Sequence, residues 1–280
     1  MKRITKKDIY AKHGIIYRAS DGKILSPLFG WIKPLLVDGN AKIGKGAYHF
    51  STLPTNRIYN VVIDGKEYSV NGTCNCTCMN ADGKITCYAT KGNYNFKSVI
   101  ASLAKKTLLC YQHLDFVKRA IMAQIEADKI KLVRIHAAGD FYSMDYALMW
   151  KSIVDTFPCV TFWTYTKNKA CESVFDTCAN GNIVKSFLPN GKMNFGHCDH
   201  IIAMYEMLKA SGKSVHICFC GIEKYAGIPV KHCTNCHSCA TCDYVLFIEH
   251  STDYHAEKDP LFPALVQMIL AQDDNESKAA

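Results

Sequence analysis

The stretch Lys131-Leu-Val-Arg-Ile-His-Ala-Ala-Gly-Asp-Phe141 decides the fold that the sequence predicts. Its first half is a short apolar run typical of a buried β-strand, and Ala-Ala-Gly-Asp then turns the chain. Ser143 follows as the predicted N-cap of a helix over 144–156, with Asp145 in the first turn. A strand that leads through a turn into a helix is the first half of a strand–helix–strand unit, so a parallel sheet is expected.

The same alternation continues on both sides of this stretch. The expected elements are a helical stretch over 99–130, strands over 160–165, 183–188, 215–220 and 244–248, and helices over 199–210 and 261–271. The turn Asp64-Gly65 between two strand-like runs predicts a β-hairpin upstream. The polar tail 272–280 is expected to be frayed. Four or five strand–helix units with right-handed crossovers predict an α/β fold, a partial or closed parallel barrel.

Length and composition allow one large domain with an extension. The chain has 280 residues, of which 49% are hydrophobic, enough for a sizeable core. The simplest division is an N-terminal segment with the hairpin (1–70), an α/β barrel core (71–215) and a cysteine-rich, metal-binding extension with a terminal helix (216–280). No run reaches the length of a membrane helix, so no membrane partner is expected. The basic start leads into no apolar signal core, so we expect a cytoplasmic protein.

Ten of the 15 cysteines fall into two groups that we expect to bind metal. The first group is Cys74, Cys76, Cys78 and Cys87, and the second group is Cys218, Cys220, Cys233, Cys236, Cys239 and Cys242. Thiolates at such short steps can converge on one metal centre. In a reducing compartment this spacing favours metal ligation, with structural disulfides as the alternative.

The second group has the more specific spacing. From Cys233 to Cys242 a cysteine stands at every third position, the run that holds a 4Fe–4S cluster in bacterial ferredoxins, where a further ligand comes from afar. Cys218 or Cys220 could supply that ligand. Zinc is the alternative, because paired Cys-x-x-Cys units, or cysteines with a neighbouring histidine, also make a tetrahedral site. The five remaining cysteines are expected to be small buried hydrophobes.

The first group and the Gly139 turn are expected at one edge of the sheet. Loops that follow the carboxyl ends of parallel strands gather there and bind ligands, so Cys87 and Gly139 should meet. Gly139 permits close approach of the backbone to a ligand, and Asp140 offers a carboxylate to an amine or hydroxyl.

Two further side chains at strand ends complete the candidate catalytic set of His136, Asp140 and Lys167. Each has a structural alternative. His136 could satisfy hydrogen bonds in the core, Asp140 could cap the next helix, and Lys167 could lie in solvent.

This order of parts resembles the radical S-adenosylmethionine (radical SAM) enzymes. In that superfamily three cysteines of an early loop hold a 4Fe–4S cluster, and a turn after the second strand contacts the methionine amine of the cofactor. The resemblance makes Ala138-Gly139-Asp140 the counterpart of that turn. It implies one or two 4Fe–4S clusters, S-adenosylmethionine, an electron donor, and a deoxyadenosyl radical acting on an unknown small-molecule or macromolecular substrate. The one-residue gaps between Cys74, Cys76 and Cys78 depart from the superfamily spacing, so which three thiols ligate is open.

A closer resemblance is to the phage gene product 88 family. It rests on five short motifs in one order: Cys87-Tyr88-Ala89, Lys91-Gly92, Arg134-x-His136-x-x-Gly139-Asp140-Phe141, Tyr146 with Trp150, and Tyr165-Thr166-Lys167. The motifs lie within about residues 70–245. The resemblance implies a phage protein and brings little mechanism with it.

Charge and missing motifs limit the function classes. The net charge is +8 and the pI is near 8.7, which allows nucleic acid as a partner, but the sequence has no run of Lys and Arg. A lysine-rich solvated surface is the favoured explanation. No P-loop, dinucleotide fingerprint or Gly-x-Ser-x-Gly elbow is present, which argues against NTPases, NAD enzymes and hydrolases. The alternative to a radical SAM enzyme is a non-catalytic zinc or iron–sulfur protein that binds nucleic acid or a protein partner.

Overall fold

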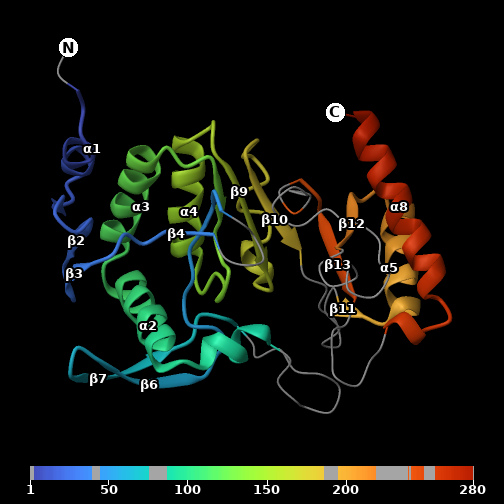
Figure 1. Ribbon diagram of the computed structural model, residues 1–280, viewed down its shortest axis with the longest axis horizontal. Helices are drawn as coiled ribbons and strands as arrows, with labels where there is room; N and C mark the ends of the chain where they lie inside the picture. The colour runs from blue at the N-terminus through green and yellow to red at the C-terminus, as the bar shows by residue number, and fades with distance from the viewer. Residues whose placement is uncertain are drawn as a thin grey trace.

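A five-stranded sheet forms the centre of the computed structural model, which describes residues 3–39, 45–75, 87–185, 195–218, 239, 241–248 and 256–279 (Figure 1). Its strand order is β10-β9-β8-β5-β4. The strands are β4 (Val37–Asp38), β5 (Ala47–His49), β8 (Leu132–Arg134), β9 (Thr161–Thr166) and β10 (Gly181–Lys185). Neighbours from β5 to β10 pair in parallel, and β4 is an antiparallel edge strand. The strands predicted around 131–136 and 160–165 are therefore confirmed as neighbours in a parallel sheet.

Helices cover one face of this sheet. They are α3 (Leu114–Asp128) and α4 (Met144–Thr156), and α2 (Lys97–Gln112) packs beside α3. Val133 and Phe162 on that face share a buried core with Ile121 of α3 and Trp150 of α4. The helix α4 and its Ser143 N-cap are as predicted, because the Ser143 hydroxyl accepts from the Tyr146 N–H. The single helical stretch predicted over 99–130 is instead two helices that part at His113, whose φ of −141° is not helical.

The predicted hairpin is confirmed and connects β5 to the first cysteine group. It consists of β6 (Ile58–Ile63) and β7 (Lys66–Asn71), and it packs on α2. Asp64 and Gly65 have φ of 51° and 82°, the left-handed pair that a two-residue type I′ turn requires.

The N-terminal residues cover the end of the molecule next to α3 (Figure 1). They form α1 (Lys6–Lys12) and an antiparallel sheet of β1 (Tyr17–Arg18), β2 (Lys23–Ser26) and β3 (Gly30–Ile32). The ammonium groups of Lys6 and Lys12 pair with carboxylates at the end of α3, but both lysines are more than half exposed, so these pairs contribute little.

The C-terminal part has a sheet and a core of its own. Its parallel strands are β11 (Phe195–Gly196), β12 (Val215–Cys218) and β13 (Tyr244–Ile248), in the order β11-β13-β12. The helices α5 (Cys198–Ala210) and α8 (Phe262–Ala279) pack against this sheet (Figure 1). The predictions for α5, β12 and β13 are confirmed. The tail was expected to be frayed; instead, α8 continues through it to Ala279.

The strands expected in one barrel thus lie in two parallel sheets in the described part of the chain, and β10 contacts β13 where the sheets adjoin. The partial or closed barrel and the division at 70 and 215 stay predictions. The strands β4 and β5 come from the N-terminal segment and pair into the central sheet. Across the described residues, none of the helices is long and apolar enough to span a membrane.

Candidate functional site

The turn after β8 is locked to two other segments at the carboxyl edge of the sheet. Gly139 has φ +88°, and a Cβ there would lie 1.9 Å from the Thr52 hydroxyl and 2.6 Å from the Thr73 hydroxyl. The Thr52 N–H donates to the Ala138 carbonyl (3.0 Å), and the Asp140 N–H donates to the Thr73 hydroxyl (3.0 Å). Only glycine fits this position, because both the backbone angle and the space exclude a side chain.

Asp140 joins the end of β8 to the end of β9. Its side chain is 4% exposed. One carboxylate oxygen accepts from the Thr166 hydroxyl (2.7 Å) and the Phe141 N–H (2.7 Å), and the other accepts from the Lys167 N–H (2.8 Å). Burial raises the pKa of Asp140 to about 6, and these donors act in the opposite direction. The carboxylate thus accepts hydrogen bonds from backbone and side-chain groups of the protein itself. The helix α4 is capped by Ser143 and not by Asp140. A catalytic or cofactor-binding role for Asp140 stays a prediction.

His136 lies in the core and is held through both ring nitrogens. Its Nδ1 is 3.1 Å from the Thr164 hydroxyl and its Nε2 is 3.1 Å from the Tyr146 hydroxyl. Burial, and secondarily the Arg134 charge, lowers the pKa of His136 to about 3. The imidazole is therefore neutral at physiological pH. These contacts match the structural alternative left open by the sequence, in which His136 satisfies core hydrogen bonds.

Cys87 of the first cysteine group packs against the Gly139 turn. Cys87 is 9% exposed and packs with Ala89 and Ala138, so the expected meeting of this group with the turn is confirmed for Cys87. The next residue, Tyr88, begins a short 3-10 helix (Tyr88–Thr90) and donates its hydroxyl to the Ala137 carbonyl. Cys74 directly follows Thr73, the residue that holds the turn from the other side.

Arg134 connects this site to the second cysteine group. Its guanidinium donates to the Tyr88 hydroxyl (3.4 Å) and to the His136 carbonyl (3.1 Å), and it lies 5.2 Å from the centre of the Tyr165 ring. The Tyr165 hydroxyl in turn donates to Cys239 Sγ (2.7 Å). A continuous series of contacts therefore runs from Cys87 and Tyr88 through Arg134 and Tyr165 to Cys239.

The described members of the second group gather beside β10. The Asn182 amide donates to the carbonyls of Cys239 and Cys242 (2.9 Å each). Cys218 packs with Val184 and Val245, and Cys239 and Cys242 adjoin the same cluster. Sequence reasoning quoted Tyr88 and Tyr165 in family motifs but gave them no linking role, and it did not name Asn182. A signal was available for Tyr165, because it alternates with Trp163 on the strand face opposite the helices.

Lys167 stands where β9 ends, close to both Asp140 and Tyr88. Its positive charge lowers the pKa of the Asp140 carboxyl and opposes the rise that burial causes in the pKa of Tyr88. Lys167 and Arg134 thus bring two positive charges to this edge of the sheet. A catalytic role for Lys167 stays a prediction.

The described side chains include half of the ten thiols predicted to bind metal. Within the described ranges, no group of three or more His, Cys, Asp or Glu side chains is arranged to hold a metal ion. Half of the ten predicted thiols fall outside those ranges, namely Cys76, Cys78, Cys220, Cys233 and Cys236. No disulfide joins two of the described cysteines.

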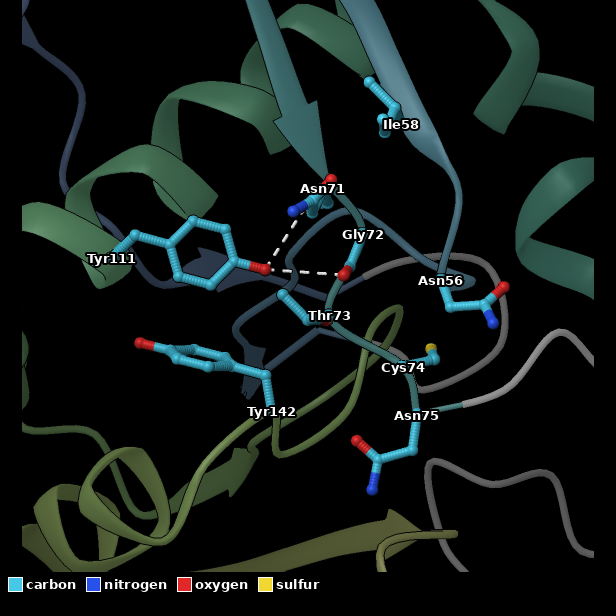
Figure 2. Close-up of a pocket in the computed structure, with 9 residues that line it drawn as sticks. All are labelled: Asn56, Ile58, Asn71, Gly72, Thr73, Cys74, Asn75, Tyr111 and Tyr142. Carbon is cyan, nitrogen blue, oxygen red and sulfur yellow. Dashed lines mark hydrogen bonds between the residues drawn. The ribbon is translucent and has the colours of Figure 1, made fainter.

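A pocket of about 640 Å³ opens beside Cys74 (Figure 2). Tyr111 and Tyr142 stand on one side of it, with ring centres 4.7 Å apart and planes at 78°. The Tyr111 hydroxyl donates to the carbonyls of Asn71 (3.3 Å) and Gly72 (3.4 Å). The other described lining residues are Asn56, Ile58, Thr73 and Asn75. The described lining is uncharged, with aromatic faces and amide groups that suit a neutral, planar ligand.

Comparison with known proteins agrees with the motifs around this edge. Residues 34–188 match the model of the family "Gene product 88". The "Gene 88 protein" of Mycobacterium phage D29 is 41% identical over 64 residues, which are 22% of this chain and 24% of that protein. The chain thus spans about a quarter of the length of this curated relative. No solved structure matches, and none of these matches is to a radical SAM enzyme. Because the family model covers more than half of the chain, including β5, β8, β9 and the Gly139 turn, the chain belongs to the gene product 88 family.

Proposed function

We propose that this phage-type protein is an iron–sulfur protein whose first cysteine group holds a 4Fe–4S cluster at the carboxyl edge of the central sheet. The observation that carries the proposal is the convergence on this edge. Cys74 and Cys87 flank the Gly139 turn, and Tyr165 brings Cys239 to the same region. Soft thiolate ligands select zinc or iron–sulfur centres. In this proposal β5, β8, β9 and β10 form an incomplete barrel around the site.

The finer proposal is a radical SAM reaction. A cluster held by Cys87 and other thiols of the first group would supply one electron for the reductive cleavage of S-adenosylmethionine, with an external protein or chemical reductant as donor. The backbone of Ala138 and Gly139 lines the cofactor site, and the Thr52 and Thr73 contacts keep that backbone fixed. Arg134 and Lys167 supply positive charge for an anionic group of the cofactor. The pocket beside Cys74 receives the substrate, which packs against Tyr111 and Tyr142 (Figure 2).

Cofactor cleavage tests this reaction directly. The anaerobically reconstituted full chain should release deoxyadenosine from S-adenosylmethionine under dithionite. Cys87→Ala should abolish the product, because it removes a buried thiol at the turn. Cys159→Ser is the matched control, since Cys159 is exposed and outside both groups, and it should keep full activity. Absence of deoxyadenosine from a chain that carries its cluster would reject the radical SAM reaction and leave the iron–sulfur proposal standing.

A second candidate is a structural zinc protein that binds nucleic acid. The Asn182 amide donates hydrogen bonds to the carbonyls of both Cys239 and Cys242. A Cys-x-x-Cys turn whose backbone is held in this way is also suited to a closed zinc site. The net charge of +8 supports an anionic partner. A colourless protein with zinc, and DNA retention that weakens as salt rises, would favour this candidate over the first.

A further inference from the structure

A second, smaller pocket of about 240 Å³ lies between the end of β5 and helix α2. His49 and Ser51 line it from the β5 side, and Ser98, Ser102 and Lys106 line it from α2. Val37, Tyr94, Val99 and Leu103 complete the described lining. No described residue is shared with the pocket beside Cys74, so the two pockets are separate sites.

Lys106 is a buried amine without a counter-ion among the described residues, and burial lowers its pKa to about 8, so it is mostly protonated at neutral pH. It is 9% exposed, and its ammonium lies 5.4 Å from the centre of the Phe50 ring. The lysines found in ion pairs in the described structure are Lys6, Lys12, Lys23, Lys105, Lys151 and Lys169. Lys105, its neighbour in sequence, pairs with Asp64 across 2.8 Å. Burying an unpaired ammonium is costly, so a buried lysine that lines a cavity is a candidate for pairing with a bound anion.

No described group around this cation can supply the negative charge. The pocket has no acidic residue in its described lining. Burial, with the charges of Lys106 and Arg134, lowers the pKa of His49 to about 4, so its imidazole is neutral. Burial raises the pKa of the Cys110 thiol on the same helix to about 12, so that thiol is neutral as well. Burial likewise raises the pKa of Tyr94 to about 12.

We propose that this pocket binds a small aliphatic carboxylate. The carboxylate pairs with the Lys106 ammonium and accepts hydrogen bonds from the serine hydroxyls at the pocket wall. Val37, Val99 and Leu103 give the pocket an apolar side, which suits a short hydrocarbon tail and disfavours inorganic phosphate. The site uses no cysteine of either group, so it stands independently of the proposed cluster.

Protection from lysine modification tests the site in the full chain. Butyrate is the probe, butyramide is its uncharged counterpart, and inorganic phosphate is the competing oxyanion. Reductive methylation, read residue by residue by mass spectrometry, should slow at Lys106 as butyrate saturates, and it should not change at Lys105. Butyramide and phosphate should protect much less. The same protection should persist in Cys87→Ala, which separates this site from the metal.

Two matched variants complete the test. Lys106→Met should weaken butyrate binding, measured by calorimetry, by about tenfold or more through the lost charge-assisted contact. It should not lower the melting temperature, because it removes an unpaired buried charge. Lys105→Met should leave butyrate binding unchanged. Equal protection by butyramide would show that the pocket does not select an anion, and protection by phosphate alone would overturn the carboxylate assignment. Failure of butyrate to protect Lys106 at millimolar concentration would refute the site.

Discussion

Single residues at the carboxyl edge decide whether the candidate site can form, and Gly139 is the strictest of them. We predict that Gly139→Ala destabilises the protein by roughly 3 kcal/mol or more, because the added methyl group overlaps Thr52 and Thr73. Gly46 is the matched control. It has the same φ of +88° with nothing within 4 Å of its added Cβ, so Gly46→Ala should cost only about 1–2 kcal/mol. Urea unfolding measures both free energies, and equal losses would contradict the packing account.

The buried histidines make stability depend on pH. The pKa values of His136 and His49 are lowered to about 3 and about 4, while unfolded histidine titrates near pH 6.5. Their contribution is therefore complete above about pH 6.5 and is lost as the pH falls, by up to about 1.4 kcal/mol per pH unit for each histidine. Asp140 acts in the opposite direction, because its raised pKa of about 6 means that it takes up a proton in the folded state as the pH falls. Between pH 6 and 4 the free energy of unfolding should therefore fall with the slope of about one bound proton, or about 1.4 kcal/mol per pH unit.

The measurement for this prediction is the free energy of unfolding at several pH values between 7.5 and 4. His136→Gln should flatten the slope by about one bound proton, because it removes one neutral buried imidazole. An unchanged slope in His136→Gln would mean that His136 is not the titrating group.

At the same residue scale, the sequence could name His136 and Asp140 but not their partners. Thr166 and Lys167, which donate to Asp140, lie at the end of β9, and they reach Asp140 only because β9 pairs with β8 in the sheet.

At the scale of elements, the contact between β9 and the second cysteine group is the most informative. The hydroxyl of Tyr165 reaches Cys239, just before β13. We predict that Tyr165→Phe, which removes only this hydroxyl, costs about 1 kcal/mol of local stability. Amide exchange in β13 should then quicken by about fivefold. Tyr205→Phe, which removes the hydroxyl of a half-buried tyrosine on α5, is the control and should leave this exchange unchanged. Unaltered exchange in β13 of Tyr165→Phe would show that the second group docks without this bond.

Elements with a strong local signal could be predicted from the sequence, and elements set by distant pairing could not. The Asp64-Gly65 turn requires two left-handed residues, and Ser143 is a strong N-cap, so the hairpin and α4 were predictable. The strand β5 has only three residues and no apolar alternation. Its place beside β8 depends on pairing with residues far along the chain. The break at His113 carries no glycine or proline signal.

At the scale of the whole molecule, the described members of two cysteine groups far apart in sequence lie at the central sheet, those of the first group at its carboxyl edge and those of the second group beside β10. The groups themselves, and the meeting of Cys87 with the Gly139 turn, were predictable from spacing and from the rule that loops gather at the carboxyl edge. The link through Arg134 and Tyr165 was not, because it depends on how the second parallel sheet adjoins β10. The site thus combines residues of both parallel sheets.

The iron and acid-labile sulfide content of the anaerobically reconstituted chain tests whether an iron–sulfur centre forms at the Gly139 turn. We expect about four irons and four sulfides for each cluster bound. The metal at the first site should be lost in Cys87→Ala and kept in Cys159→Ser. Stoichiometric zinc without sulfide would contradict an iron–sulfur centre at the Gly139 turn. An iron content that is the same in Cys87→Ala as in the unchanged chain would contradict it as well.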